Sequence, residues 1–195
     1  MGAPVVDLSF PHQWTAEILP HRPLILPARQ FVYPAQVEEV ERGALEVLVR
    51  PSPPSASAPP PFLATCALGF ADPSAPTGLW SCPDPAWLCA VAGGYAYLIN
   101  SGQPGQWKQV EYRPVLSVRS LAEQRLLLFA GHHSLTAWSS EGKAWQSSRL
   151  SWEGVQIIEV NGWTLTGSGW DLMTDRDVEF SLDLRTGEHS GGVGA

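Results

Sequence analysis

Leu88-Cys-Ala-Val-Ala-Gly93 begins a pattern that returns twice, as Leu126-Leu-Leu-Phe-Ala-Gly131 and as Trp163-Thr-Leu-Thr-Gly-Ser-Gly169. Each stretch is largely apolar, ends in a glycine and is followed by a second strand-like segment, at 95–100, 134–139 and 178–184. The closing glycines are 38 residues apart in both intervals (131 − 93 and 169 − 131). A fixed period of this size is typical of stacked sheets or propeller blades, because one such unit cannot bury its apolar face alone. The sequence therefore predicts an all-β fold of blade-like antiparallel sheets.

Two candidate hairpin turns lie inside this region. Glu141-Gly142 and Asn161-Gly162 each interrupt a run of strand-forming residues, and Asn-Gly is the strongest short hairpin signal in the chain. Two-residue loops at these positions would fix the register of the flanking strands. The expected cross-strand pairs are Trp138 with Trp145 and Val160 with Trp163.

Two segments resemble the repeats of quinoprotein-like (PQQ-like) β-propellers. Ser134-Leu-Thr-Ala-Trp-Ser-Ser-Glu-Gly-Lys-Ala-Trp145 is similar to their strand-turn-strand core, and Phe180-Ser-Leu-Asp-Leu-Arg-Thr-Gly-Glu188 resembles the commoner Thr-Gly form. The resemblance covers about residues 87–190 and implies blade-like sheets. It carries over no quinone, because no ligand of that cofactor can be matched residue by residue, and we expect no cofactor. The chain is short for such a family, so the resemblance implies a small or incomplete β-propeller, with a β-sandwich as the alternative.

Composition limits the classes of partner. The 195 residues are 44% hydrophobic and 16% charged, which is typical of a globular chain. The net charge is −7 and Lys and Arg form no cluster, which argues against nucleic acid and against an anionic membrane surface. No segment has the apolar length of a membrane span or the pattern of a secretion signal, and the three cysteines suit a reducing compartment. We therefore expect a cytoplasmic protein.

Proline divides the chain. Residues 1–27 contain five prolines and are predicted to form an extended arm on the surface. Residues 28–50 are predicted to form a β-hairpin packed on the main domain, and 51–61 a proline-rich loop. Residues 62–195 are predicted to form the β-repeat domain, with one structural domain overall.

His132 and His133 are the first candidates for chemistry. A histidine pair in a loop could bind a transition metal or exchange protons near neutral pH. Adjacent residues on a strand point to opposite sides, however, so ordinary turn polarity is the favoured interpretation.

An acidic stretch is the candidate metal site, and its four members are Asp171, Asp175, Asp177 and Glu179. Oxygen ligands gathered there could hold calcium, although the spacing is not that of an EF-hand loop. Alternate positions of a strand would instead place these carboxylates on a solvated face, with Val178, Phe180 and Leu182 on the buried one. That second interpretation is favoured.

Nine tryptophans require an explanation, and four of them are candidate partner-binding residues: Trp138, Trp145, Trp152 and Trp170. Wide aromatic side chains stabilise sheet packing, which is the simpler interpretation. Exposed tryptophans could instead stack on sugars or form hot spots of a protein interface.

Three functions remain open. The leading prediction is a non-catalytic binding or scaffold module that engages a protein partner or a second copy of itself. The alternatives are a carbohydrate-binding, lectin-like module that uses exposed tryptophan, and a small metal-dependent hydrolase. No P-loop, dinucleotide fingerprint, nucleophile elbow or HExxH helix is present. This argues against the commonest enzyme classes but not against a new one, so a non-catalytic role is favoured and we name no catalytic residue.

Overall fold

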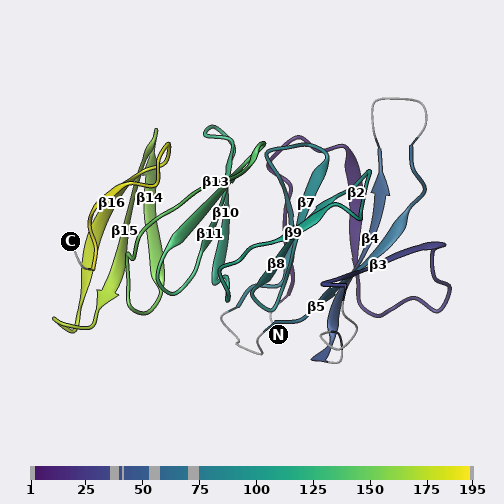
Figure 1. Ribbon diagram of the computed structural model, residues 1–195, viewed down its shortest axis with the longest axis horizontal. Helices are drawn as coiled ribbons and strands as arrows, with labels where there is room; N and C mark the ends of the chain where they lie inside the picture. The colour runs from purple at the N-terminus through teal and green to yellow at the C-terminus, as the bar shows by residue number, and fades with distance from the viewer. Residues whose placement is uncertain (1–2, 36–39, 41, 53–57, 70–74, 194–195) are drawn as a thin grey trace. The chain divides into compact units, whose positions relative to one another are not determined.

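The computed structural model describes residues 3–35, 40, 42–52, 58–69 and 75–193, and these residues form β-strands and no α-helix. The strands make four sheets in which most neighbours are antiparallel (Figure 1). The all-β prediction is therefore confirmed. The chain divides into two compact units, residues 1–114 and 115–195, whereas the sequence predicted one structural domain. Each unit is described by itself below.

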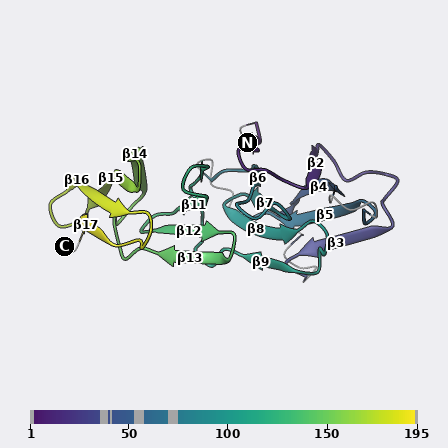
Figure 2. The same cartoon turned by 90° about the horizontal axis from the view of Figure 1, so that it is seen from above.

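The first unit contains two sheets. One has the order β2 (Trp14–Leu19), β4 (Ala44–Pro51), β5 (Phe62–Ala67) and β3 (Arg29–Tyr33). The other has the order β1 (Val5–Asp7), β6 (Gly78–Ser81), β7 (Trp87–Ala92), β8 (Tyr95–Asn100) and β9 (Trp107–Gln109). Strands β6 to β9 follow one another in chain order, as Figure 2 shows.

One apolar core joins these two sheets. Val47 and Phe62 of the first sheet and Leu88 of the second are buried in the same cluster. Two hydrogen bonds from aromatic side chains cross between the sheets: Trp14 Nε1 donates to the Trp87 carbonyl at 3.1 Å, and the Tyr97 hydroxyl donates to the Ala67 carbonyl at 2.9 Å. Buried aromatic rings with satisfied polar ends therefore hold the two sheets together.

Two predictions for the N-terminal region are wrong. The predicted surface arm instead contains β1, which pairs in parallel with β6, and β2, which pairs with β4 and buries Trp14 almost completely. The predicted hairpin at 28–50 is absent, because β3 and β4 both pair with β5, on opposite sides of it. All six residues of β5 are buried, and the strand lies between β4 and β3 in the sheet. In a β3–β4 hairpin these two strands would instead be direct neighbours. Much of the predicted proline-rich loop, at 53–57, lies outside the described residues.

Residues 20–28 form a loop between β2 and β3 that extends away from the sheet (Figure 1). Its base is fixed by the guanidinium of Arg22, which donates to Glu46 Oε1 and Thr65 Oγ1 at 3.2 Å each and to Gln30 Oε1 at 3.0 Å. The Thr65 hydroxyl also donates to Glu46 Oε2 at 2.7 Å. This network satisfies the carboxylate of Glu46, which is mostly buried.

The second unit contains two four-stranded antiparallel sheets, each in chain order. The first consists of β10 (Ser117–Leu121), β11 (Leu126–Ala130), β12 (Leu135–Ser139) and β13 (Gly142–Gln146). The second consists of β14 (Val155–Asn161), β15 (Thr164–Asp171), β16 (Arg176–Asp183) and β17 (His189–Gly191). The three stretches that ended in spaced glycines lie in β7, β11 and β15, and the segments that follow them lie in β8, β12 and β16.

The register predicted for the β12–β13 hairpin is wrong. Trp145 lies opposite Ala137, and Trp138 lies opposite Lys143, so the two tryptophans are not a cross-strand pair. The loop is at 140–141, and Gly142, with φ of +117°, begins the returning strand. The positive φ that glycine permits is used after the turn rather than inside it, together with a bulge in the ladder.

The register predicted for the β14–β15 hairpin is also wrong. Val160 pairs with Leu165 instead of Trp163, and the loop is at 162–163. Gly162 has φ of +58° and occupies the first central position, which suits a type II′ turn. The turn therefore lies one residue later than the Asn-Gly signal indicated.

The core of the second unit lies between its two sheets. Leu128, Leu165 and Phe180 are buried in one cluster, and Trp145 Nε1 donates a hydrogen bond to the Leu184 carbonyl at 2.8 Å. The alternation predicted for β16 is confirmed: Phe180 and Leu182 are buried, while Asp177 and Glu179 are exposed on the opposite face.

Candidate functional site

Three loops meet at one end of the second unit: 131–134, 147–154 and 172–175. Backbone hydrogen bonds join them. The first two loops are joined by Leu150 N, which donates to the His133 carbonyl at 2.7 Å, and by Gly154 N, which donates to the His132 carbonyl at 2.8 Å. Trp152 N donates at 2.9 Å to the carbonyl of Trp170, which lies in β15 just before the third loop. This end gathers two of the four candidate tryptophans and both candidate histidines.

The turn between β15 and β16 is fixed by two tryptophans, and we call residues 170–175 together with Trp152 the Trp-clamped turn. Trp170 Nε1 donates to Asp175 Oδ1 at 3.3 Å, and the indole of Trp152 lies beside Asp171, where it helps to lower the pKa of that carboxyl. Asp171 also accepts from the Thr174 hydroxyl at 2.8 Å and from Met173 N at 3.3 Å. Asp175 therefore accepts from an indole, and Asp171 accepts from the turn itself with a second indole beside it.

These hydrogen bonds favour the ionised form of Asp171. Its pKa lies below the usual value of an aspartate, because the Thr174 hydroxyl hydrogen-bonds the carboxylate, as do the backbone of the turn and the indole of Trp152. Burial acts in the opposite direction and is outweighed. Asp171 thus remains a charged acceptor throughout the neutral range, and its role is to hold the turn.

The tip of the Trp-clamped turn is apolar and exposed. Leu172 is 54% exposed and Met173 is 84% exposed. Asp175, next to them, has φ of +53°, a conformation that residues other than glycine adopt rarely. An unusual backbone conformation and a set of side-chain hydrogen bonds thus present two large apolar side chains to solvent.

Arg149 lies beside this turn. Its guanidinium carbon is 4.2 Å from the centroid of the Trp152 ring, a cation–π contact, and its Nη1 is 3.4 Å from His133 Nδ1. Trp152 is 38% exposed, so one face of its ring is covered by the arginine and part of its surface remains accessible. The pair extends the apolar tip into a larger aromatic and cationic surface.

The two histidines do not form a metal site with their neighbours. Their ring centroids are 6.1 Å apart and the planes are tilted by 48°. His133 Nδ1 lies 3.3 Å from the Ser151 carbonyl. The backbone of both residues is used to join loops, which agrees with the structural interpretation of this pair.

The predicted metal site is not assembled either. Asp171 and Asp175 are used by the Trp-clamped turn, while Asp177 and Glu179 lie on the solvent face of β16, where alternate residues are separated by about 7 Å. Within the described ranges, no three His, Cys, Asp or Glu side chains come close enough to hold a metal ion.

Trp138 and Trp145 lie away from the Trp-clamped turn. Trp145 is 8% exposed and belongs to the core, which agrees with the packing interpretation, and a role in binding stays a prediction. Trp138 is half-buried on β12. The three cysteines are not accessible for reaction. Cys66, Cys82 and Cys89 are all buried, and burial raises the pKa of each thiol.

Sequence reasoning missed two features. One is the exposed tip formed by Leu172 and Met173. From the sequence pattern alone, two apolar residues in a turn look the same as two apolar residues in a strand. The other is a pocket of about 330 Å³ at the opposite end of the second unit, on whose rim lie Arg125, Trp163 and Arg185. Arg125 and Arg185 are 60 positions apart in the sequence, so no local motif marks them.

These features define an all-β protein with a preorganised apolar surface on one turn. No family model matches the chain, and neither a curated protein nor a solved structure matches it. The part of the chain that the structure describes has no helix with the length and apolarity that a membrane crossing requires.

Proposed function

We propose that the protein is a non-catalytic binding module that engages a protein partner through the Trp-clamped turn. The observation that carries this proposal is the exposure of Leu172 and Met173 on a turn whose two aspartates are held by hydrogen bonds. Asp171 accepts from Thr174 and from Met173 N, and Asp175 accepts from the indole of Trp170. Large apolar side chains that remain exposed in a fixed geometry are typical of interaction sites. Fixing them before binding reduces the entropy that association would otherwise cost.

The neighbouring residues support a protein partner. Tryptophan and arginine are the residue types most enriched in interface hot spots, and methionine adapts to the shape of an opposing apolar surface. Arg149 and Trp152 lie in contact beside the tip, so they can surround it and exclude water when a partner binds. A second copy of the chain would satisfy the same chemistry, and a cytoplasmic location remains a prediction.

Carbohydrate binding has less support. A sugar-binding tryptophan needs an open ring face, whereas the Trp152 ring has an arginine above it and Trp145 is buried. The metal-dependent hydrolase has less support as well, since its proposed ligands are spread over a turn and a strand. The most exposed large hydrophobic side chains in the described part of the second unit are Met173, Ile158 and Leu172, none of them aromatic.

The test is retention of partners by the double variant Leu172→Ser with Met173→Ser. Purified protein would be immobilised, exposed to lysate of its source and compared by quantitative mass spectrometry. We expect the double variant to lose the proteins that the unmodified chain retains. The matched control is Ile158→Ser, which removes an exposed apolar side chain from β14 (62% exposed) and should retain them.

A second variant tests the conformation of the turn separately from its apolar side chains. Asp171→Asn weakens the hydrogen bonds of the turn and leaves both apolar side chains in place, so it should weaken binding about tenfold, mainly through lost preorganisation. Light scattering on the unmodified chain distinguishes self-association from a different partner. Equal retention by the double variant and the Ile158→Ser control would refute the proposal.

A further inference from the structure

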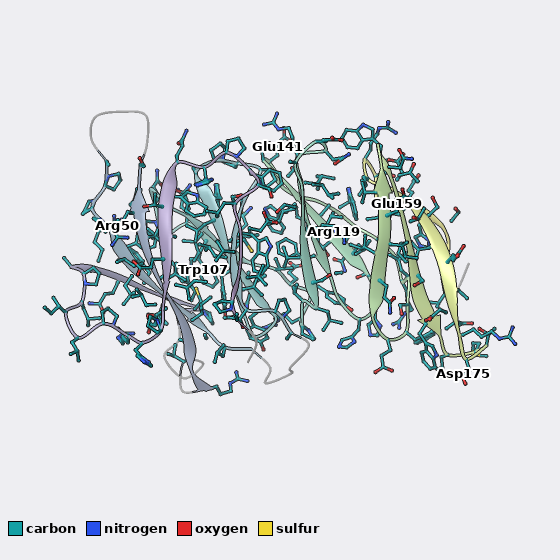
Figure 3. All side chains as sticks on the ribbon, turned by 180° about the vertical axis from the view of Figure 1, so that it is seen from behind. Arg50, Trp107, Arg119, Glu141, Glu159 and Asp175 are labelled. Atoms are coloured by element: carbon teal, nitrogen blue, oxygen red, sulfur yellow. The ribbon has the colours of Figure 1, made fainter. Side chains whose placement is uncertain are left out.

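The pocket at the other end of the second unit is built by four separate turns. These are the turns at 122–125, 140–141 and 162–163 and the residues that follow β16. Gln124 Nε2 donates to the Gly162 carbonyl at 2.6 Å, and Leu184 N donates to the Trp163 carbonyl at 2.8 Å, so hydrogen bonds connect the walls. Figure 3 shows Glu141, of the 140–141 turn, and Asp175 at opposite ends of this unit, which separates the pocket from the Trp-clamped turn.

The floor of the pocket is apolar. Its apolar lining consists of Ala144, which is exposed, Leu126 and Trp145, which are 6% and 8% exposed, and Leu184, which other residues cover completely. The indole N–H of Trp145 is already used by the Leu184 carbonyl, so the floor offers carbon surface rather than hydrogen bonds. A ligand that fills it must present an apolar group.

The rim is cationic. Arg185 has its guanidinium carbon 5.1 Å from the centroid of the Trp163 ring and also pairs with Asp183 at 3.4 Å. Arg125 is exposed, and among the described residues its guanidinium has no hydrogen-bond or ion-pair partner. Its φ is +55°, a left-handed conformation that is unfavourable for an arginine and that persists only where the surrounding structure holds it.

We propose that this pocket binds a carboxylate carried on an apolar group, with Arg125 and Arg185 taking the carboxylate and the floor taking the apolar group. Guanidinium groups match the planar geometry of a carboxylate and bind it through paired hydrogen bonds. The volume of about 330 Å³ lies at the lower end of the range for small-ligand sites, which suits one apolar side chain with its acid group.

The charges favour a carboxylate over a phosphate. Asp183 already neutralises part of the charge of Arg185, and the chain as a whole carries a net charge of −7. A doubly charged phosphate would face both sources of repulsion, and it would leave the apolar floor unused. A singly charged acid on a hydrocarbon body satisfies the rim and the floor together. Two sources supply this chemistry, the free carboxyl terminus of a peptide with an apolar last residue and a free apolar carboxylic acid.

The test follows the indole N–H signals of Trp145 and Trp163 by NMR during titration of the intact chain. The probes are N-acetyl-Leu-Leu with a free carboxyl terminus, the same dipeptide as its amide, and 4-phenylbutyrate. We expect saturable shifts of both signals with at least one of the acids, and affinity about tenfold or more lower for the amide. Binding of the dipeptide alone identifies a chain terminus as the ligand, and binding of 4-phenylbutyrate alone identifies a free acid.

Substitutions test whether the two rim arginines bind the carboxylate. Arg125→Gln and Arg185→Gln should each weaken binding of the acid about tenfold, because each removes a charged hydrogen-bond donor. Arg176→Gln, an exposed arginine at the start of β16, is the matched control and should bind as the unmodified chain does. The proposal is wrong if neither acid shifts the two signals at concentrations up to about 10 mM, a very weak affinity. It is also wrong if acid and amide bind equally, or if the two rim variants behave as the control does.

Discussion

Replacement of Trp145 by phenylalanine tests how the two sheets of the second unit are held together. Trp145 lies on β13, is 8% exposed, and donates from Nε1 to the Leu184 carbonyl at 2.8 Å. Its ring also packs on Gly187, where an added Cβ would lie 2.6 Å from the indole. Phenylalanine retains an aromatic ring at this position and removes the donor, so it isolates the hydrogen bond and the outer part of the ring.

The expected loss of stability has two parts. The Leu184 residue is fully buried, so its carbonyl would lose its partner without gaining water, at a cost of about 1–3 kcal/mol. The phenyl ring is smaller than the indole by about 40 Å² of buried area, which corresponds to about 1 kcal/mol. We therefore expect the free energy of opening this unit to fall by about 2–4 kcal/mol.

Native-state hydrogen exchange with mass spectrometry measures this change strand by strand. Protection of the amides in β11 and β16 should fall by about 30-fold or more, since 1.4 kcal/mol corresponds to a factor of ten. Trp163→Phe is the control, because Trp163 is 39% exposed and its replacement should change protection less than about fivefold. The reasoning is refuted if Trp145→Phe lowers protection no more than the control does.

Three further predictions concern other parts of the chain. In a double-mutant cycle, Arg22→Ala and Glu46→Ala should show a coupling of about 1 kcal/mol in urea unfolding, because the Glu46 side chain is mostly buried and the Arg22 side chain is 45% exposed. The Glu17–Arg50 pair, at 3.9 Å with both side chains about half exposed or more, should show a coupling near zero. The carboxyl of Asp171 should titrate in NMR with a midpoint below 3.8, so the stability that its ionised form contributes is present above the ordinary pKa and is lost as the pH falls through the lowered one. Thr174→Val should move that midpoint upward. Iodoacetamide at pH 8 should leave the three buried cysteines unmodified until the chain is unfolded, and rapid modification of the native chain would contradict their burial.

Local patterns were enough to predict many of the strands, although not β1 and β2. The alternation of Asp177 and Glu179 with Val178, Phe180 and Leu182 follows from the two-residue period of a strand, and it needs no information from elsewhere in the chain. The apolar runs that became β7, β11 and β15 were recognised for the same reason.

The register of the turns and the pairing of distant strands could not be predicted in this way. Moving a loop by one residue changes the φ of a single glycine, and the Asn-Gly signal does not say which central position that glycine takes. The pairing of β3 with β5 depends on which strand has both faces buried, a property of the assembled sheet. The equally spaced glycines are needed for different reasons. Gly93 has a positive φ of +55°, which favours glycine, whereas at Gly169 an added Cβ would lie 2.3 Å from the Leu150 carbonyl oxygen.

The candidate site was predicted in part. Trp152 and Trp170 were selected as exposed aromatic residues, and they do lie in one cluster. There the Trp170 indole donates to Asp175 and the Trp152 indole lies beside Asp171, two aspartates that had been candidate metal ligands. Sequence spacing places these carboxylates near one another, but only the folded turn shows that Asp175 accepts from the Trp170 indole and that Asp171 accepts from Thr174 and from Met173 N.

The parallel pairing of β1 with β6 has a consequence for biosynthesis. Val5 pairs with Gly78, which is 73 positions later in the chain (78 − 5). At about 5–20 residues per second, the ribosome takes roughly 4–15 s to synthesise that interval, so the first strand waits for its partner with its edge unpaired. In the second unit every strand pairs with its neighbour in sequence, and each hairpin can close as soon as it leaves the ribosome. The nascent chain is thus most vulnerable to aggregation early, before β6 emerges, and fusions or deletions at the N-terminus should reduce the yield of folded protein more than equal changes at the C-terminus.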